Sequence, residues 1–259
     1  MYYSSSFKHA GILLLFHLLT IYQCFTFPLY FIDRTQRVLL LHSDFTDDVE
    51  VALKQTKKFA EVSTYHADQG TPSLIQLKSY DVVLVWSMAM FFDSKALGEV
   101  LADYWDAGGR VVLAQFSMTN SSSLELPATS ARLLGRFGSA DQGYLFLNSV
   151  HRVFDCCRFK MDGAGVETSP LLAGVDGVAL AGIVVNMVAI NGGEVVASWS
   201  NGYPLLVRGT RGGRCLIAIN ASPRSILGQD IDSEVTARPR LFKPHPPRSH
   251  VFMRSVLIA

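Results

Sequence analysis

The sequence has no excess of charge of either sign and contains little cysteine. Its 23 lysine and arginine residues balance 22 aspartate and glutamate residues, and no block of like charge exceeds a few residues. A nucleic-acid-binding surface normally appears as a basic excess, so the sequence predicts no nucleic-acid partner. The sequence also lacks internal repeats, which excludes repeat architectures, and it lacks a linker that would divide the chain into two domains.

The four cysteines include no C-x-x-C pair, which argues against a structural zinc site. Adjacent cysteines rarely bond to each other, because their Cβ vectors diverge. In an oxidising compartment we therefore consider a disulfide between Cys157 and Cys215, or between Cys156 and Cys215. The alternative is that all three are buried thiols that pack as small hydrophobic residues. His151 lies near Cys156 and Cys157 in sequence, but the spacing matches no ligand pattern, so we predict no metal site and no cofactor.

An apolar stretch near the beginning indicates targeting. Residues 10–32 carry no formal charge, Lys8 precedes them, and Arg34 follows them. A short basic region followed by an apolar region is typical of a signal peptide, and the stretch is long enough to span a bilayer if it is not cleaved. We therefore expect residues 1–35 to be a signal peptide or a signal anchor. The protein would then be secreted or membrane-anchored, with its domain outside the cytoplasm.

Two asparagines are consistent with a secretory route. Asn120 and Asn220 each begin the Asn-x-Ser pattern that accepts N-linked glycans. We treat both as candidate glycosylation sites. The alternative is that each is an ordinary polar residue of a loop.

The remaining residues, 36–259, are enough for one large domain. Apolar residues make up 49% of the chain and charged residues 17%, so this part is expected to be globular. Its first half alternates strand and helix patterns. Strands are predicted at 37–42, 61–66, 80–86 and 110–116, with helices near 47–60, 73–77 and 93–107. The helix near 47–60 is expected to begin at Asp47, with Glu50 completing a capping box.

The second half changes to short runs separated by glycine. Strands in hairpins are predicted at 143–150, 181–190, 194–199 and 205–207. A strand at 215–219 returns to the sheet, and a helix is predicted at 250–259. Alternating strands and amphipathic helices favour parallel pairing with right-handed crossovers. The predicted fold is a flavodoxin-like α/β domain. It has an open, mostly parallel sheet with helices on both faces, and an antiparallel hairpin extension in the second half.

Several of these segments resemble one family. They are Val38–Leu41, Tyr80–Trp86, Leu97–Tyr104, Asp106–Val112, Ser169–Val175, Val195–Leu205 and Gly213–Ile217. Together they are similar to class I glutamine-amidotransferase-like domains, in particular the trehalose-utilisation-protein-like branch, over residues 37–259. The resemblance implies an amidotransferase-like α/β domain.

The catalytic residues of that family are not matched. Working members place a nucleophilic cysteine on a tight turn after the strand that corresponds to 111–116. Here the turn reads Gln115-Phe116-Ser117-Met118, and Ser169 replaces the histidine of a His-Pro segment. No His-x-Glu follows near the C-terminus. A thiolate mechanism needs a sulfur atom beside a base, so the resemblance implies a domain without amidotransferase activity.

Ligands of open α/β sheets bind beyond the carboxyl ends of the strands. Ser117 as nucleophile, His42 as base and Asp44 as orienting group would satisfy the logic of a catalytic triad, although no Gly-x-Ser-x-Gly turn supports them. Candidate ligand-binding residues at the same strand ends are Ser43, Trp86, Ser87 and Phe116. Residues 86–92 form an apolar loop, which is expected either to pack beneath the connection at 117–150 or to line a pocket.

The sequence therefore favours a non-catalytic binding or interaction domain of a secreted or membrane-anchored protein. Its partner would be a small molecule, a glycan or another protein. The alternatives are a hydrolase with an altered site around Ser117 and His42, and a structural domain of a larger surface assembly.

Overall fold

A computed structural model describes residues 36–118, 131–162, 169–172 and 178–226, together with residues 253, 256 and 257. Within these ranges, the side chains of residues 150–158, 170, 179, 181 and 182 are not described. No helix in this part of the chain is long and apolar enough to cross a membrane. The predicted targeting segment, residues 1–35, lies outside the described residues.

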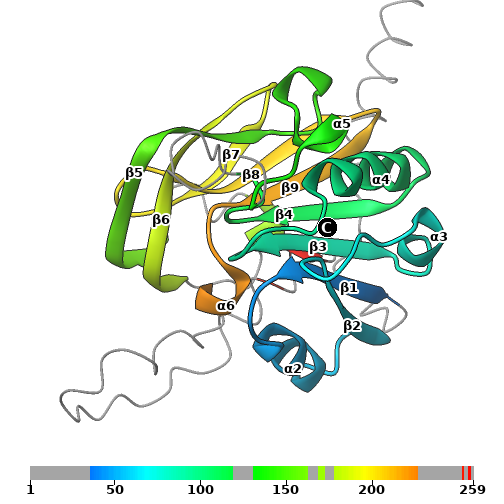
Figure 1. Cartoon of the computed structure of the whole chain (residues 1–259). Helices are drawn as coiled ribbons and strands as arrows, with labels where there is room; N and C mark the ends of the chain where they lie inside the picture. Colours follow the sequence, from blue (N-terminus) through cyan, green and yellow to red (C-terminus); the bar gives the residue numbers. More distant parts are fainter. Residues whose placement is uncertain are drawn as a thin grey trace, which may run out of the picture.

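The core of the fold is a seven-stranded sheet with the order β2-β1-β3-β4-β9-β8-β7 (Figure 1). The strands are β1 (Arg37–Ser43), β2 (Glu61–His66), β3 (Val82–Ser87), β4 (Arg110–Ala114), β7 (Glu194–Ser198), β8 (Pro204–Arg211) and β9 (Arg214–Ile219). The pairs from β2 to β9 are parallel, and β9, β8 and β7 pair antiparallel. The predicted four parallel strands of the first half are therefore confirmed, as is the return of the 215–219 strand to the sheet.

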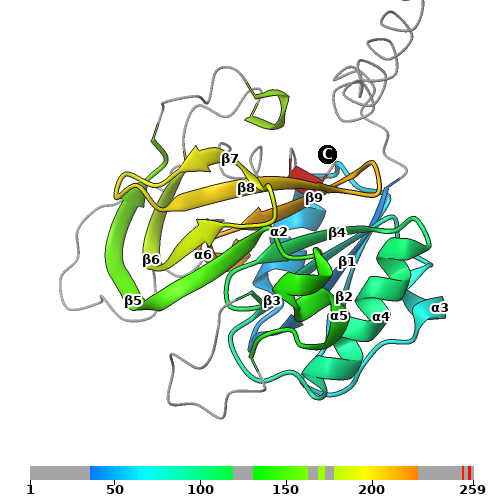
Figure 2. The ribbon, with the colours of Figure 1, turned by 90° about the horizontal axis from the view of Figure 1, so that it is seen from above.

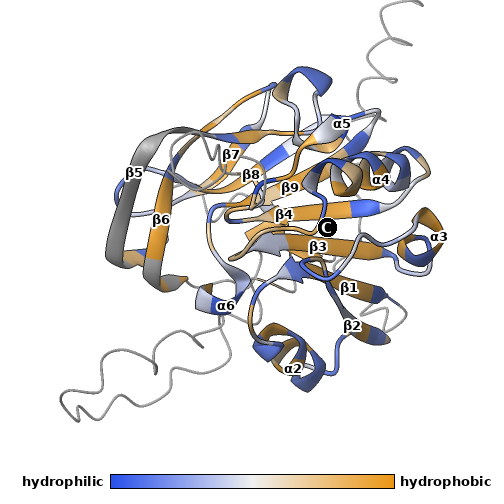
Figure 3. Ribbon diagram, viewed as in Figure 1, coloured by the Kyte–Doolittle hydropathy of each residue, from blue (hydrophilic) through white to orange (hydrophobic). Residues whose placement is uncertain are grey.

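The central strands are buried on both faces. Figure 3 shows β1, β3 and β4 as mainly hydrophobic strands at the centre of the molecule. Six of the seven residues of β1 and all six residues of β3 are buried. Continuous apolar runs of this kind are expected where helices cover both sides of a parallel sheet.

Helices lie on both faces of the sheet. The helices are α2 (Asp48–Gln55), α3 (Leu74–Leu77), α4 (Ser94–Asp106), α5 (Gly135–Gly138) and α6 (Pro223–Ile226), with 3₁₀ turns at Ala140–Gln142 and Pro170–Leu172. The buried side chains of α2 and α6 pack in one core cluster, with Met253, Val256 and Leu257. Those of α3 and α4 pack in a second cluster on the other face. All three belong to the segment 250–259 for which a helix was predicted, and all three are buried.

Local signals explain the ends of α4. The Asp93 carboxylate accepts hydrogen bonds from the backbone N–H groups of Lys95 and Ala96, as an N-cap residue does. After the last residue of the helix, Gly108 has φ +105°, a conformation that glycine adopts without steric cost.

A two-stranded antiparallel ribbon extends from the sheet. It consists of β5 (Leu147–Lys160) and β6 (Ala179–Ala189), and it lies beside α6 in Figure 1 and again in Figure 2, where the molecule is seen from above. The Gln115 side chain at the end of β4 donates to the Ile183 carbonyl oxygen at 2.7 Å. The Asn220 amide, which follows β9, accepts from the Val185 N–H and donates to its carbonyl oxygen. These contacts place the ribbon at the carboxyl ends of β4 and β9.

Candidate functional site

The carboxyl edge of the parallel strands, where ligands of such sheets bind, has two unlike parts. At the ends of β4 and β9 the polar side chains are buried: Gln115, Ser117 and Asn220 are all at most 2% exposed. The β5–β6 ribbon is bonded to this part. At the ends of β1, β2 and β3, in contrast, titratable and apolar side chains reach solvent. We call these the closed part and the open part of the edge.

Ser117, the predicted nucleophile, lies in the closed part. It is fully buried, and its hydroxyl donates to the Ala114 carbonyl oxygen at 2.6 Å and lies 3.4 Å from that of Val85. A nucleophilic hydroxyl must face both a base and the substrate. Ser117 instead faces two backbone acceptors, so its hydroxyl stabilises the turn, and the predicted catalytic role has no support in its contacts.

Phe116 occupies the bend itself. Its φ is +68°, a conformation that is rare for a bulky residue other than glycine. The turn after β4 is therefore sharp, with a phenylalanine at the bend. Phe116 is half-buried and packs against the core cluster that contains α4.

The other predicted ligand-binding residues serve the structure of the loops. The Ser43 hydroxyl donates to the Ala89 carbonyl oxygen at 2.7 Å, and the Ser87 hydroxyl donates to that of Ala131. Ser43, Ser87 and Trp86 are at most 1% exposed. Because all three side chains are buried, and the hydroxyls of Ser43 and Ser87 are already bonded, they do not line an accessible site.

His42 and Asp44 lie together, but not as base and orienting carboxylate. The backbone N–H of Asp44 donates to His42 Nδ1 at 3.0 Å. The Asp44 carboxylate accepts from the Phe45 N–H at 2.7 Å and from Trp86 Nε1 at 3.2 Å. A carboxylate that orients a catalytic histidine accepts an imidazole N–H. Here Nδ1 is the acceptor, so the predicted triad of Ser117, His42 and Asp44 is not formed.

His42 belongs instead to a row of three rings across neighbouring strands. It is the parallel-register partner of His66 on β2 and of Trp86 on β3. The His42 ring stacks on Trp86, with centroids 4.2 Å apart, and meets the His66 ring edge-on at 5.3 Å. Burial lowers the pKa of His42 to about 4, although the nearby Asp44 carboxylate acts in the opposite direction. The His42 ring is therefore neutral near pH 7.

Asp47 completes this group and corrects one prediction. It precedes α2, but its side chain makes no capping hydrogen bond, and Glu50 bonds to Lys54 and Thr64 in place of a capping box. The Asp47 Oδ1 atom lies 3.7 Å from His42 Nε2 and 3.5 Å from His66 Nε2. Asp47 and His66 are partly exposed, so the group opens to solvent beside the buried His42.

The sequence contains a signal for the position of His66. His42 and His66 each stand at the carboxyl end of a predicted strand, and parallel pairing brings such residues side by side. The capping rules, in contrast, do not predict that the Asp47 carboxylate leaves the N–H groups of its own helix without a capping bond.

Exposed apolar side chains surround the open part of the edge. The Met88 and Ala89 N–H groups donate to the Ser43 carbonyl oxygen, and the Phe92 N–H donates to that of Ala67, so the loop after β3 crosses the ends of β1 and β2. The exposed residues, which we call the apolar rim, are Phe45 (82%), Met88 (47%), Met90 (55%) and Phe92 (69%). Between Met88 and Phe92, Phe91 is the buried apolar side chain, at 4% exposure, and it packs in the core cluster that contains α4. Phe91 packs in the core cluster that also contains Met118, Leu133 and Phe137, as the first of the two predicted alternatives expects, and the residues of the apolar rim line no pocket that the described residues show.

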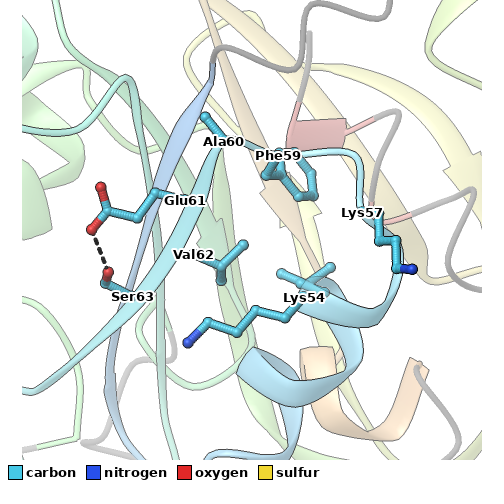
Figure 4. A pocket seen from close by; sticks show the side chains of 8 residues that line it. Lys54, Lys57, Phe59, Ala60, Glu61, Val62 and Ser63 are labelled. Carbon is cyan, nitrogen blue, oxygen red and sulfur yellow. Dashed lines mark hydrogen bonds between the residues drawn. The ribbon is translucent and has the colours of Figure 1, made fainter.

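A hollow of about 650 Å³ lies elsewhere, at the beginning of β2 (Figure 4). Its lining comes from α2 and from the β2 end opposite the carboxyl edge, and comprises Leu53, Lys54, Lys57, Phe59, Ala60, Glu61, Val62 and Ser63. Two of its polar side chains are already bonded: Lys54 to Glu50, and Ser63 to Glu61. The hollow has no converging set of reactive groups, so we place the candidate site at the open part of the carboxyl edge.

Three further predictions concern modification. The Asn220 amide is fully buried and bonded to Val185 through both its oxygen and its nitrogen. An N-linked glycan needs an exposed amide nitrogen, so the burial of Asn220 argues against this candidate glycosylation site. Asn120 lies outside the described residues. Cys215 is half-buried on β9, whereas the side chains of Cys156 and Cys157 lie outside the described part, and with them both predicted disulfides.

Comparison with known proteins shows similarity at the level of the fold. No protein-family model matches the chain, and no curated protein matches it. Two solved structures from Salmonella typhimurium are similar. The cytoplasmic protein STM3548 has a TM-score of 0.52 and 14% identity, over 72% of this chain and 88% of that one. The cytoplasmic protein STM1381 has a TM-score of 0.52 and 15% identity, over 73% of this chain and 92% of that one. At such identities the likeness concerns the fold alone.

Proposed function

We propose that this protein is a non-catalytic binding module built on a flavodoxin-like, glutamine-amidotransferase-like domain. Its binding surface is the open part of the carboxyl edge, bounded by the apolar rim. The proposal includes the secretory route inferred from residues 1–35, which would place the module outside the cytoplasm. Its partner is a small molecule, a glycan or a protein with an apolar face.

The observation that carries the proposal is the state of the turn after β4. The bend holds Phe116, and the hydroxyl of the neighbouring Ser117 is buried and bonded to the Ala114 carbonyl oxygen. The ribbon is bonded to Gln115 directly before the bend. A substrate would have to displace these contacts to reach Ser117, so both the amidotransferase and the hydrolase chemistry lack an accessible nucleophile there.

The apolar rim supports binding as the alternative to catalysis. Solvent-exposed apolar side chains on monomeric proteins are usually scattered, and those that gather in one place often mark an interaction site. Phe45 and Met88–Phe92 come from two loops that the backbone bonds to Ser43 and Ala67 hold together. A patch that is fixed in this way needs little reordering when a partner binds.

Two assays test the proposal. Hydrolysis of glutamine and of p-nitrophenyl acetate is measured for the wild type and for Ser117→Ala; we expect equal background rates for both proteins. A wild-type rate that falls in Ser117→Ala would overturn the non-catalytic assignment and restore the hydrolase.

The second assay measures how much of the fluorescent probe anilinonaphthalene sulfonate binds to the protein under native conditions. We expect the double variant Phe45→Ser, Phe92→Ser to bind clearly less probe than the wild type. Ile75→Ser is the matched control, because Ile75 is 81% exposed on α3, away from the rim. Equal binding by the double variant and the wild type would show that the rim is not a binding surface.

A further inference from the structure

The seven-stranded sheet has two unlike edge strands, β2 and β7. The pairing of β7 with β8 contains two register shifts, between Val195 and Ala197 and between Ala197 and Ser198. Irregularities of this kind bend an edge strand and discourage further pairing. β2, in contrast, pairs with β1 in one unbroken register over its whole length. Its edge is therefore regular enough to receive another strand.

The outer side of β2 presents backbone groups at every second residue. The Ala60 N–H donates to the Gln36 carbonyl oxygen, so the backbone of Ala60 points to β1. Because backbone groups alternate along a strand, those of Glu61, Ser63 and Tyr65 point away from β1. Among the described residues, no strand pairs with this side of β2. The strand also contains no proline or lysine, the residues that commonly protect an exposed edge.

The two ends of β2 are flanked by opposite charges. Lys57 and Lys58 precede the strand, and Asp68 follows it. Lys58 stands five positions before Ser63, and Asp68 stands five positions after it. A second copy of the strand that runs antiparallel and is centred on Ser63 therefore brings Lys58 of each chain near Asp68 of the other. A parallel copy would bring like charges together, so the charges favour antiparallel self-pairing.

We propose that the protein forms a homodimer in which the β2 strands of two copies pair antiparallel about Ser63 and join the two sheets into one. In this register Ser63 faces Ser63 of the partner subunit, and Glu61 faces the partner's Tyr65. All of these residues point their backbone groups outward, as hydrogen-bonded antiparallel pairs require. The interface is the same surface on both chains, so it closes as a pair. The inference goes beyond the proposed function, because it concerns a different surface from the apolar rim.

The hollow at the beginning of β2 lies beside the same edge (Figure 4). Ala60 and Val62 line it from the strand, and Phe59 lines it from the segment before the strand. Side chains that face each other across paired strands lie on the same face of the sheet. The partner's Thr64 would therefore lie opposite Val62, and the partner's His66 opposite Ala60. The dimer would thus cover this hollow with side chains from the end of the partner's strand.

The antiparallel arrangement also constrains the segment before residue 36. It turns the beginning of β1 in the two copies to opposite sides of the joined sheet, so the two preceding segments leave in opposite directions. If residues 1–35 are cleaved, the dimer forms between free domains. If they anchor the chain, the dimer joins chains from two opposing surfaces.

A charge exchange tests the interface. Sedimentation equilibrium of the full-length protein in a density-matched detergent measures the association, and we expect a reversible dimer. Lys58→Glu and Asp68→Lys each replace two attractions by two repulsions in the dimer, so each should raise the dissociation constant at least about tenfold. The double variant Lys58→Glu, Asp68→Lys restores opposite charges and should return to within about threefold of the wild type.

A control separates this effect from a general effect of charge. Lys95→Glu makes the same charge reversal at an exposed position of α4, and the dissociation constant should not change. Lys58 and Asp68 belong to neither core cluster, so their variants should unfold in urea at the midpoint of the wild type.

A cross-link tests the register. The Cα atoms of a hydrogen-bonded antiparallel pair are about 5.5 Å apart, a distance that a disulfide spans. Ser63→Cys should therefore form a covalent dimer on mild oxidation, well above the background that the chain's own cysteines give in the wild type. Lys95→Cys should give only that background.

Three outcomes would overturn the dimer: a wild type that stays monomeric, an association that neither charge reversal weakens, or a double variant as weak as the single ones. A Ser63→Cys protein that forms no more covalent dimer than Lys95→Cys would overturn the register. None of these outcomes affects the probe assay on Phe45 and Phe92, so the dimer and the proposed function can fail separately.

Discussion

The His42 ring lies flat against the Trp86 indole, with centroids 4.2 Å apart and 20° between the planes. Both rings are at most 1% exposed, and each is bonded to Asp44, one to its backbone N–H and the other to its carboxylate. Asp44 therefore joins two neighbouring strands at the point where they end. A buried imidazole held in this way responds to acid differently from one on the surface.

The first prediction concerns pH. Burial lowers the pKa of His42 from 6.5 to about 4, so between these values the unfolded chain binds a proton that the folded chain does not. Above pH 6.5, His42 does not lower the free energy of unfolding. As the pH falls from 6.5 to about 4, the free energy of unfolding decreases by about 3 kcal/mol because of this group. Urea unfolding at pH 7 and pH 4 measures the loss.

The control for this prediction is His42→Gln, which keeps a polar side chain but does not titrate. Other carboxylates titrate in both proteins, so the quantity to compare is the difference between their losses. If both proteins lose the same free energy of unfolding, His42 does not carry the effect.

The second prediction concerns the ribbon. Asn220→Ala removes both hydrogen bonds to Val185 and leaves a buried N–H and a buried carbonyl without partners. Each unsatisfied group costs about 1–3 kcal/mol, so we expect a loss of at least about 2 kcal/mol in urea unfolding. Protease cleavage within 147–189 should become faster. Gln69→Ala, at an exposed turn, should be nearly neutral; an equally small effect of Asn220→Ala would contradict the proposed anchoring.

The third prediction compares two aspartates that precede helices. Asp93→Ala removes the N-cap of α4 and should lower the free energy of unfolding by about 1 kcal/mol. Asp47→Ala removes no cap from α2, so its effect should stay within about 0.5 kcal/mol. Chemical denaturation of both variants measures the difference. A larger loss for Asp47→Ala than for Asp93→Ala is the result that would contradict the capping assignment.

The fourth prediction concerns Gly98, in the middle of α4. Alanine normally stabilises such a position by up to about 1 kcal/mol. Here a Cβ atom would lie 1.7 Å from the Leu134 carbonyl oxygen, so the backbone of α5 would have to move. We expect Gly98→Ala to lower the thermal unfolding midpoint and to cost about 1–3 kcal/mol. Lys95→Ala, at an exposed position of the same helix, serves as control; a Gly98→Ala protein as stable as the wild type would exclude the close contact.

The sequence was sufficient for the parallel half of the fold. The runs around Leu40, Leu84 and Val112 are continuously apolar, and such runs are typical of strands buried on both faces when amphipathic helices alternate with them. It was not sufficient for the closed part of the edge. The bonds of Gln115 and Asn220 to β6 join residues that are 68 and 35 positions apart, and no local pattern specifies them.

The candidate site was predicted only in its location. The strand predicted at 110–116 ends earlier, at Ala114, but the edge itself was identified. His42 and Asp44 were named together, although in a triad that does not form, and His66 was not named. Ser117 and Asp44 fit a triad by residue type, yet their bonds are decided by backbone atoms that a sequence pattern does not position. The capping pattern of Asp47 and Glu50 is present in the sequence but forms no capping box, because Glu50 bonds to Lys54 and Thr64.

The direction of β1 has a consequence for orientation. The strand runs from Arg37 at one edge of the sheet to Ser43 at the other, so any segment that precedes residue 36 joins the domain on the side away from His42 and the apolar rim. If that segment is held in a bilayer, the membrane lies behind the domain. The site then faces the aqueous space, where a soluble molecule or a protein on an opposing surface can reach it without approaching lipid.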